Sequence, residues 1–404
     1  MNAWLHLNLQ KIKKIFPFFF ICLFAFSINS NKVLAQNIPK DTIGPKPTGL
    51  LTKSFTPDKS GFGPAFLGVN YTYINRKNKL PYNSKQSVVI KYNPIRKGIT
   101  TGYQGTFIET FGKWNTNLYA IYNQVEWTYF YGLSNNSPFN IPGKLYDKKY
   151  NRISNKIISA GVGVERIFKR YNKISIAPFF QSVKIKAETD SNHYVYKSVY
   201  PAETSVYNTS NFGGIALDYV YQKINDSVLP TKGIVLLTNL TYTGNFTNSN
   251  LSFARYLTEI NFYHPITKKL GFTIKAGASA LSGTPEFYQY NFVGGTHTLR
   301  GYERGRFYGN SSFYNQNELR WITDVHTKKH FGKFGLLALY DVGRVWLKNE
   351  NSTALHSGVG GGILLSVMHK ISASAVYAVS QDGNNFHFNL IRPLEYLRND
   401  SRFQ

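Results

Sequence analysis

The sequence is almost without cysteine: of its 404 residues, only Cys22 has a thiol. Cys22 lies inside an apolar stretch near the N-terminus. A chain that has lost this stretch has no disulfide and no thiolate to bind a metal. We therefore expect no metal site, and nothing in the sequence indicates a cofactor.

Long apolar runs are also missing. The longest, residues 15–26, follows several lysines that begin at Lys11 and precedes Val33-Leu34-Ala35. A helix needs about 20 apolar residues to span a bilayer, so this run is too short for a retained anchor. The pattern is typical of a secretory signal peptide. We expect residues 1–35 to be that peptide, with cleavage after Ala35 and export of the rest.

Acidic residues are scarce, with 21 Asp and Glu against 47 Lys and Arg. So strong a basic excess can indicate nucleic-acid binding. Here the basic residues are spread along the chain and concentrate in short turns, such as Lys169–Lys173 and Ile266–Leu270. No basic helix or known nucleic-acid motif accompanies them, so we expect no nucleic acid as a partner. Anionic membrane lipid, including lipopolysaccharide, or an acidic protein fits better.

Catalytic motifs are missing as well. There is no G-x-S-x-G sequence, and the glycines of residues 358–362 are not followed by the helix or the Lys-Ser/Thr pair of a phosphate loop. His297 and His356 lie near serines. The sequence does not place them together, so a serine–histidine enzyme is a minor alternative. The prediction is that the protein is not an enzyme.

What the sequence does have is an aromatic-rich alternation of period two, with 29 Tyr and 30 Phe. Segments of about ten alternating residues are what a strand of a transmembrane barrel needs. We predict an all-β, 16-stranded antiparallel transmembrane β-barrel; a secreted sandwich or propeller is the alternative. The predicted strands are Thr48–Phe55, Phe62–Ile74, Ser87–Asn93, Ile99–Phe111, Asn115–Thr128, Ser154–Phe168, Ile174–Ala187, Phe212–Gln222, Gly233–Phe246, Leu251–Tyr263, Leu270–Leu281, Phe313–Thr323, Phe334–Leu347, Leu355–Val367, Ile371–Ser380 and Phe386–Ile391.

The connections alternate between short and long, which predicts the orientation. Most short links fall on one side, whereas Tyr129–Ile153, Glu188–Asn211 and Ser282–Ser312 are long and fall on the other. Outer-membrane barrels have short periplasmic turns and long extracellular loops. The long connections are therefore expected outside the cell.

The last long loop leads into a strand through the sequence FVGGTHTLRGYERGRFYGNSSFYNQNELRW, Phe292–Trp321. Gly294 and Gly295 allow a sharp reversal, and Arg300 lies at the tip between Leu299 and the pair Gly301-Tyr302. An arginine held in such a frame usually pairs with carboxylates, because its planar fork binds them bidentately.

This loop resembles the sixth extracellular loop of the BamA/TamA-type bacterial surface antigen superfamily. Further stretches resemble landmarks of that barrel in the same order: Tyr129–Ser137, Asp226–Gly233 and Leu339–Trp346. Family members are outer-membrane barrels that insert or export other proteins. The resemblance implies that this loop folds into the lumen.

The alternation of side chains shows which carboxylates face the lumen. Glu318 lies on the polar face of its strand, opposite Leu319, and Asp341 lies opposite the apolar row that includes Tyr340. By resemblance, Arg300 binds carboxylates at these two positions and so holds the loop in the barrel. The alternative is a solvated loop arginine.

The resemblance also sets the expected domains. Residues 36–47 would form a short periplasmic tail, residues 48–392 the barrel and residues 393–404 a C-terminal extension. Family insertases have POTRA domains before the barrel that capture clients, and residues 36–47 are too few for one. A separate periplasmic partner would then have to supply client capture.

The strands that close the barrel are predicted to form a weak seam. Prolines flank the first strand and Pro393 follows the last, and proline donates no ladder hydrogen bond. The seam positions are Leu50, Leu51, Thr52, Phe386, Phe388 and Leu390.

Three functions remain open at this point. The first is insertion or translocation of client proteins at the outer membrane. The second is a passive or regulated channel that has lost client handling, and the third is an adhesive surface protein acting through its long loops.

Overall fold

The computed structural model describes residues 48–54, 66–75, 84–93, 98–139, 150–169, 171–187, 205–326, 331–367 and 371–391. The predicted signal peptide, periplasmic tail and C-terminal extension lie outside these residues. The bounds predicted for those three segments therefore stay predictions.

Within these ranges, sixteen strands form a single antiparallel sheet. Its order follows the chain, with β11 pairing directly with β14. The strands are β1 (Thr48–Ser54), β2 (Phe66–Asn75), β3 (Ser84–Asn93), β4 (Gly98–Phe111), β5 (Trp114–Tyr129), β6 (Arg152–Phe168), β7 (Asn172–Ile185), β8 (Ser210–Ile224), β9 (Gly233–Asn245), β10 (Ser252–Pro265), β11 (Leu270–Gly283), β14 (Ser311–His326), β15 (Phe331–Trp346), β16 (His356–Val367), β17 (Ile371–Ser380) and β18 (Gly383–Ile391). Each predicted strand corresponds to one of these.

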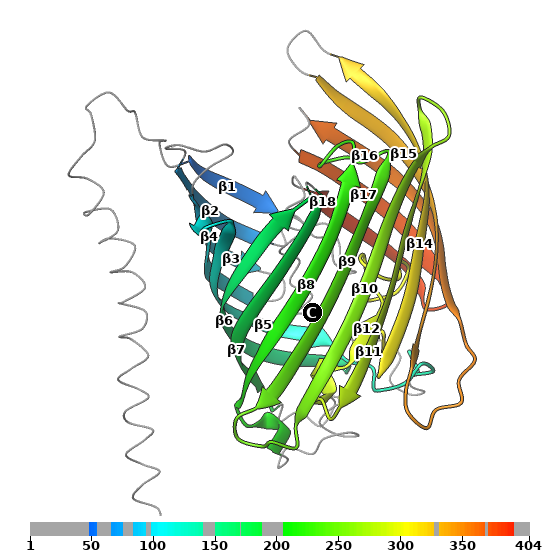
Figure 1. Ribbon diagram of the computed structural model, residues 1–404. Helices are drawn as coiled ribbons and strands as arrows, with labels where there is room; N and C mark the ends of the chain where they lie inside the picture. The colour runs from blue at the N-terminus through cyan, green and yellow to red at the C-terminus, as the bar shows by residue number, and fades with distance from the viewer. Residues whose placement is uncertain are drawn as a thin grey trace, which may run out of the picture. The chain divides into compact units, whose positions relative to one another are not determined.

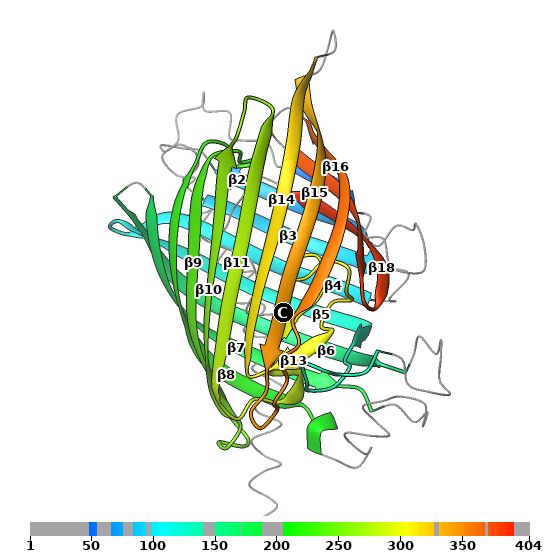
Figure 2. The same cartoon turned by 90° about the vertical axis from the view of Figure 1, so that its right-hand side faces the viewer.

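The sheet curls round an interior (Figures 1 and 2). Pairing in the part of the chain that the structure describes runs from β1 to β18, with no pair between these two end strands. The predicted antiparallel fold is therefore confirmed. The predicted closing seam is not formed by the described strands.

Side chains alternate between the interior and the outer surface, as the period of two predicts. In β7, Lys173 and Ala177 are buried, whereas Ile174 and Ile176 between them are exposed. The same holds in β15, where Leu337 and Leu339 are buried beside exposed apolar neighbours. An apolar outer face is what lipid contact requires. No helix among the described residues is long and apolar enough to cross a membrane.

One short turn also enters the interior. The turn between β8 and β9 buries Val228 and Leu229, and the Asp226 carboxylate fixes it by accepting both of their backbone N–H groups, at 2.7 and 3.0 Å. Leu229 joins an apolar cluster with interior side chains of β15, β16 and β17, namely Leu337, Leu339, Leu364, Val376 and Ala378. The turn therefore reaches across to the wall formed by the last strands.

Candidate functional site

The interior holds the loop that follows β11. After a short helical turn, η4 (Phe287–Gln289), the chain forms a ribbon of two short strands, β12 (Asn291–Val293) and β13 (Phe307–Gly309). Residues 294–306, here called the loop tip, connect them. Sequence reasoning predicted the inward loop but not this ribbon, because segments of three residues are too short to show an alternation.

Two adjacent glycines turn the chain into the loop tip. Gly294 and Gly295 have φ angles of 125° and 90°, a region that other residues rarely adopt. A side chain at Gly294 would place its Cβ 2.2 Å from the Glu303 carbonyl oxygen. The reversal is then fixed by a hydrogen bond from the Gly295 N–H to the Tyr302 carbonyl, at 3.1 Å. The glycine pair thus brings Arg300 to the end of the loop.

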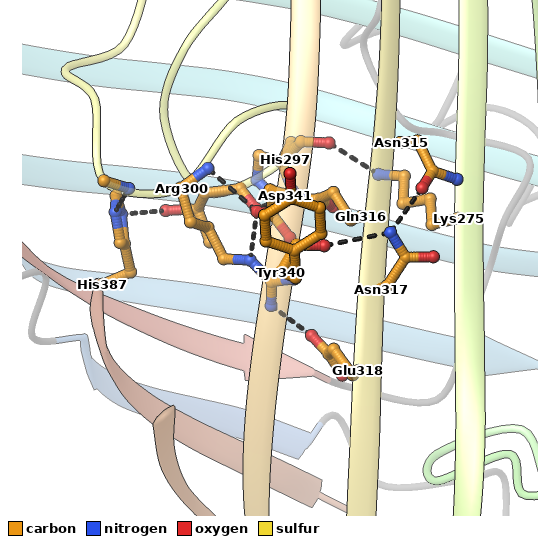
Figure 3. Close-up of polar contacts among 12 residues, drawn as sticks. Lys275, His297, Arg300, Asn315, Gln316, Asn317, Glu318, Tyr340, Asp341 and His387 are labelled. Carbon is orange, nitrogen blue, oxygen red and sulfur yellow. Dashed lines mark hydrogen bonds and ion pairs between the residues drawn. The ribbon is translucent and has the colours of Figure 1, made fainter. Parts of the chain in front are cut away.

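Arg300 binds both carboxylates that the strand alternation turned inward (Figure 3). Asp341 of β15 accepts hydrogen bonds from its Nε and Nη2, each at 2.7 Å, and from its backbone N–H at 3.0 Å. Glu318 of β14 accepts from its Nη1, and Arg320 binds the other Glu318 oxygen at 2.6 Å. We call Arg300, Glu318 and Asp341 the clasp.

Two of the three clasp residues are buried, and Glu318 is partly buried. Arg300 is 4% exposed and Asp341 is fully buried. Burial alone would lower the pKa of the Arg300 guanidinium, but the charge of Glu318 and the Asp341 carboxylate outweigh it and raise that pKa above its usual value. The Arg300 guanidinium is therefore held in its charged form at neutral pH, and the clasp does not open there by losing this proton.

Hydrogen bonds to its backbone carbonyls also hold the loop tip beside the clasp. Lys275 of β11 donates to the His297 carbonyl at 2.9 Å, and Gln316 of β14 donates to the Thr296 carbonyl at 3.1 Å. An apolar cluster also joins the loop tip to β12, β13, β14 and β15. It consists of Val293, Leu299, Tyr302, Phe307, Tyr314 and Val345. Of the predicted loop motif, Leu299 and Tyr302 thus serve as packing residues, with exposures of 0% and 1%.

A second buried arginine in the loop tip was not predicted. Arg306 is 3% exposed and donates to Asp382, in the turn between β17 and β18, at 2.5 Å. It also donates to the Ser137 hydroxyl and carbonyl, both at 2.7 Å. Its guanidinium lies 4.4 Å from the Phe307 ring centroid and 4.9 Å from that of Tyr131. Arg306 therefore joins the loop tip to two other loops.

The landmark stretch Tyr129–Ser137 forms one of those loops. Its Asn135 is fully buried, accepts the Val345 backbone N–H at 2.9 Å and donates to the Ala354 carbonyl at 2.9 Å. Leu133 forms a bridge with Tyr308 of β13. The stretch that resembled a family landmark therefore packs against the loop and the end of β15.

The predicted seam residues are only partly described. Leu50, Leu51 and Thr52 lie in β1, and Phe386, Phe388 and Leu390 in β18, the two end strands of the sheet. Phe386 is 37% exposed on the outer face. The seam itself stays a prediction.

Comparisons with known proteins agree with this architecture. A model of the Omp85 superfamily domain matches residues 87–390. No curated protein sequence matches the chain. Among solved structures, BamA from Haemophilus ducreyi lacking POTRA domains 1–3 has a TM-score of 0.59 and 16% sequence identity, over 85% of this chain and 70% of that one.

Two CdiB structures are also similar. CdiB from Escherichia coli has a TM-score of 0.57 and 13% identity, over 88% of this chain and 63% of that one. CdiB from Acinetobacter baumannii has a TM-score of 0.52 and 10% identity, over 84% and 58%. The chain thus spans less than two thirds of either CdiB. At these identities the likeness concerns the fold.

Proposed function

Because the chain belongs to the Omp85 superfamily, we propose that it acts in the insertion or translocation of proteins at the outer membrane. The observation that carries the proposal is the loop folded into the curled sheet and fastened there by Arg300 to Glu318 and Asp341. A loop that is folded into the interior and held there by ion pairs would suit a protein that changes state when a client arrives.

The proposal extends to partners and location. We propose that the chain is exported by a cleaved signal peptide and that its apolar outer face contacts outer-membrane lipid and lipopolysaccharide. Clients would be unfolded outer-membrane or exported proteins, delivered by a separate periplasmic partner. The proposed role is not enzymatic.

A paired assay in proteoliposomes tests this function. An insertase accelerates membrane integration of an unfolded barrel protein and conducts little current without a client. A passive channel conducts steadily and does not accelerate integration. Arg300→Ala should change the first activity, whereas Asp324→Asn, which removes a carboxylate that is 57% exposed, should not. Steady conductance without acceleration would replace the proposal with the channel, and the absence of both activities would refute it.

A further inference from the structure

The loop tip is bound to the final hairpin as well as to the clasp. The Gly301 carbonyl accepts hydrogen bonds from the Ser380 hydroxyl at 2.7 Å and from the Asn385 amide at 2.6 Å. The Gly301 N–H donates to Nε2 of His387 at 3.1 Å. Ser380 ends β17, and Asn385 and His387 are buried in β18. Both backbone groups of one loop residue are therefore taken up by the last two strands.

His387 uses both of its ring nitrogens on the loop. A backbone N–H can only donate, so Nε2 must be the acceptor and carries no hydrogen. In the neutral ring, Nδ1 then carries the hydrogen and donates to the Thr296 hydroxyl, 3.2 Å away. Figure 3 shows this side chain beside Arg300. A single residue of β18 thus binds the loop tip at two points.

The tip of the same hairpin is held separately. Asp382, between β17 and β18, accepts from Arg306, and its side chain is 9% exposed. The hairpin therefore contacts the loop tip through its turn at Asp382, through Ser380 and Asn385 at Gly301, and through His387. These contacts involve side chains that point into the interior, so they are independent of the ladder between β17 and β18.

Gly301 and its neighbour Arg300 together contact several adjacent strands of the sheet. Gly301 directly follows Arg300, whose side chain binds β14 and β15. Between those strands and the hairpin lies β16, where a Cβ at Gly358 would be 1.9 Å from the Arg300 carbonyl oxygen. Because Gly358 has no side chain, the loop backbone lies directly on β16. Two consecutive loop residues therefore touch all five strands from β14 to β18.

We propose that Asn385 and His387 are positioning residues that fix the last strand to the loop, so that β18 separates from the loop only when the clasp releases the loop. β18 ends the sheet, and the edge of an end strand is where another strand can add. The inference rests on the proposed function, because the loop would then control whether β18 can move when a client arrives.

The competing explanation is that β18 is held by its ladder with β17, which pairs the strands from Ser372↔Ile391 to Ser380↔Gly383. In that case the bonds to Gly301 are incidental. The two explanations differ in one respect. If the loop holds β18, then breaking the clasp at Asp341, on β15, must loosen β18 as well.

Hydrogen–deuterium exchange on the full protein in proteoliposomes, with no client present, separates them. His387→Phe keeps a ring of similar size without an acceptor, and His387→Gln restores one. Asp341→Asn weakens the clasp on β15, away from β18. Asn384→Ala is the matched control, because Asn384 is exposed on β18 and donates to the Tyr377 hydroxyl, at 2.6 Å.

We expect His387→Phe to speed exchange in peptides covering 383–391 and Gly301 about fivefold, the factor given by one net hydrogen bond. His387→Gln should return it toward the original rate, and Asn384→Ala should leave Gly301 unchanged. Asp341→Asn should speed exchange in β18 together with the loop tip. If Asp341→Asn speeds exchange in the loop tip and leaves β18 unchanged, the inference is wrong.

The outcome is decided even if His387→Phe does not fold, because the Asp341→Asn comparison leaves His387 intact. It is also independent of the insertion assay. Coupled exchange without insertion would refute the proposed function and leave the loop–strand coupling standing. Insertion without coupled exchange would refute the coupling alone.

Discussion

The two carboxylates of the clasp should respond differently to the loss of Arg300. Glu318 keeps a second arginine, Arg320, at 2.6 Å. Asp341 is fully buried, and among the described contacts its side chain would keep only two neutral donors, the backbone N–H of residue 300 at 3.0 Å and the Gln316 amide at 3.3 Å. Removing one partner of a buried ion pair costs about 3–5 kcal/mol, because a charge is left without a partner. Arg300→Met should therefore raise the open population of the loop by about 100-fold or more.

The double variant provides the sharper test. Arg300→Met combined with Asp341→Asn removes the arginine and also the Asp341 charge that would be left without an ionic partner. Neutral groups are less costly to leave buried than a carboxylate. The second substitution should therefore partly reverse the effect of the first. Two independent losses of contact would instead add to one another.

Trypsin cleavage after Arg304 measures the opening. Arg304 is exposed within the loop tip and is present in every variant. A protease acts on the opened loop, so under slow cleavage the rate follows the open population. Asp324→Asn is the control, since it removes a β14 carboxylate outside the clasp. Equal rates in Arg300→Met and the original protein, or a double variant cleaved faster than Arg300→Met, would refute the reasoning.

Three further substitutions give distinct outcomes. Gly358→Ala places a Cβ on the Arg300 carbonyl and should displace the loop without changing any charge, read as faster tryptic cleavage; an unchanged rate would show that β16 can yield. Leu229→Ala should lower the free energy of unfolding by about 2–5 kcal/mol in a urea titration, because Leu229 is 3% exposed in an apolar cluster. Cysteine pairs scanned between residues 50–54 and 386–390 should form disulfides in a single register if the two end strands meet; random or absent cross-linking would contradict the seam.

The sequence was sufficient for the parts of the site that depend on local pattern. A period of two placed Glu318 and Asp341 on the inner face, because each residue of a strand reverses the direction of the side chain. The frame of glycines around Arg300 indicated a residue held at the end of a loop. These inferences need only neighbours in the sequence, and the structure brings the three residues together.

The contacts of the final hairpin could not be obtained in this way. Alternation says that His387 faces inward but not which part of the loop it meets. That depends on the tilt of the strands and on the stagger between them, which accumulate round the sheet. The partner of Arg306 was missed for a related reason. Asp382 lies in a turn, where no alternation indicates the direction of its side chain.

The turn between β8 and β9 bears on the order in which the molecule assembles. Neighbouring strands of the main sheet follow one another in the sequence, except that the loop with β12 and β13 separates β11 from β14. Such pairs can form one after another, in chain order. Leu229 is different, because its cluster partners in β15 to β17 lie roughly a hundred residues or more further along the chain. A partial sheet that ends at β11 lacks those partners. Burial of Leu229 therefore marks the step at which the growing sheet has curled far enough for its middle to touch its end.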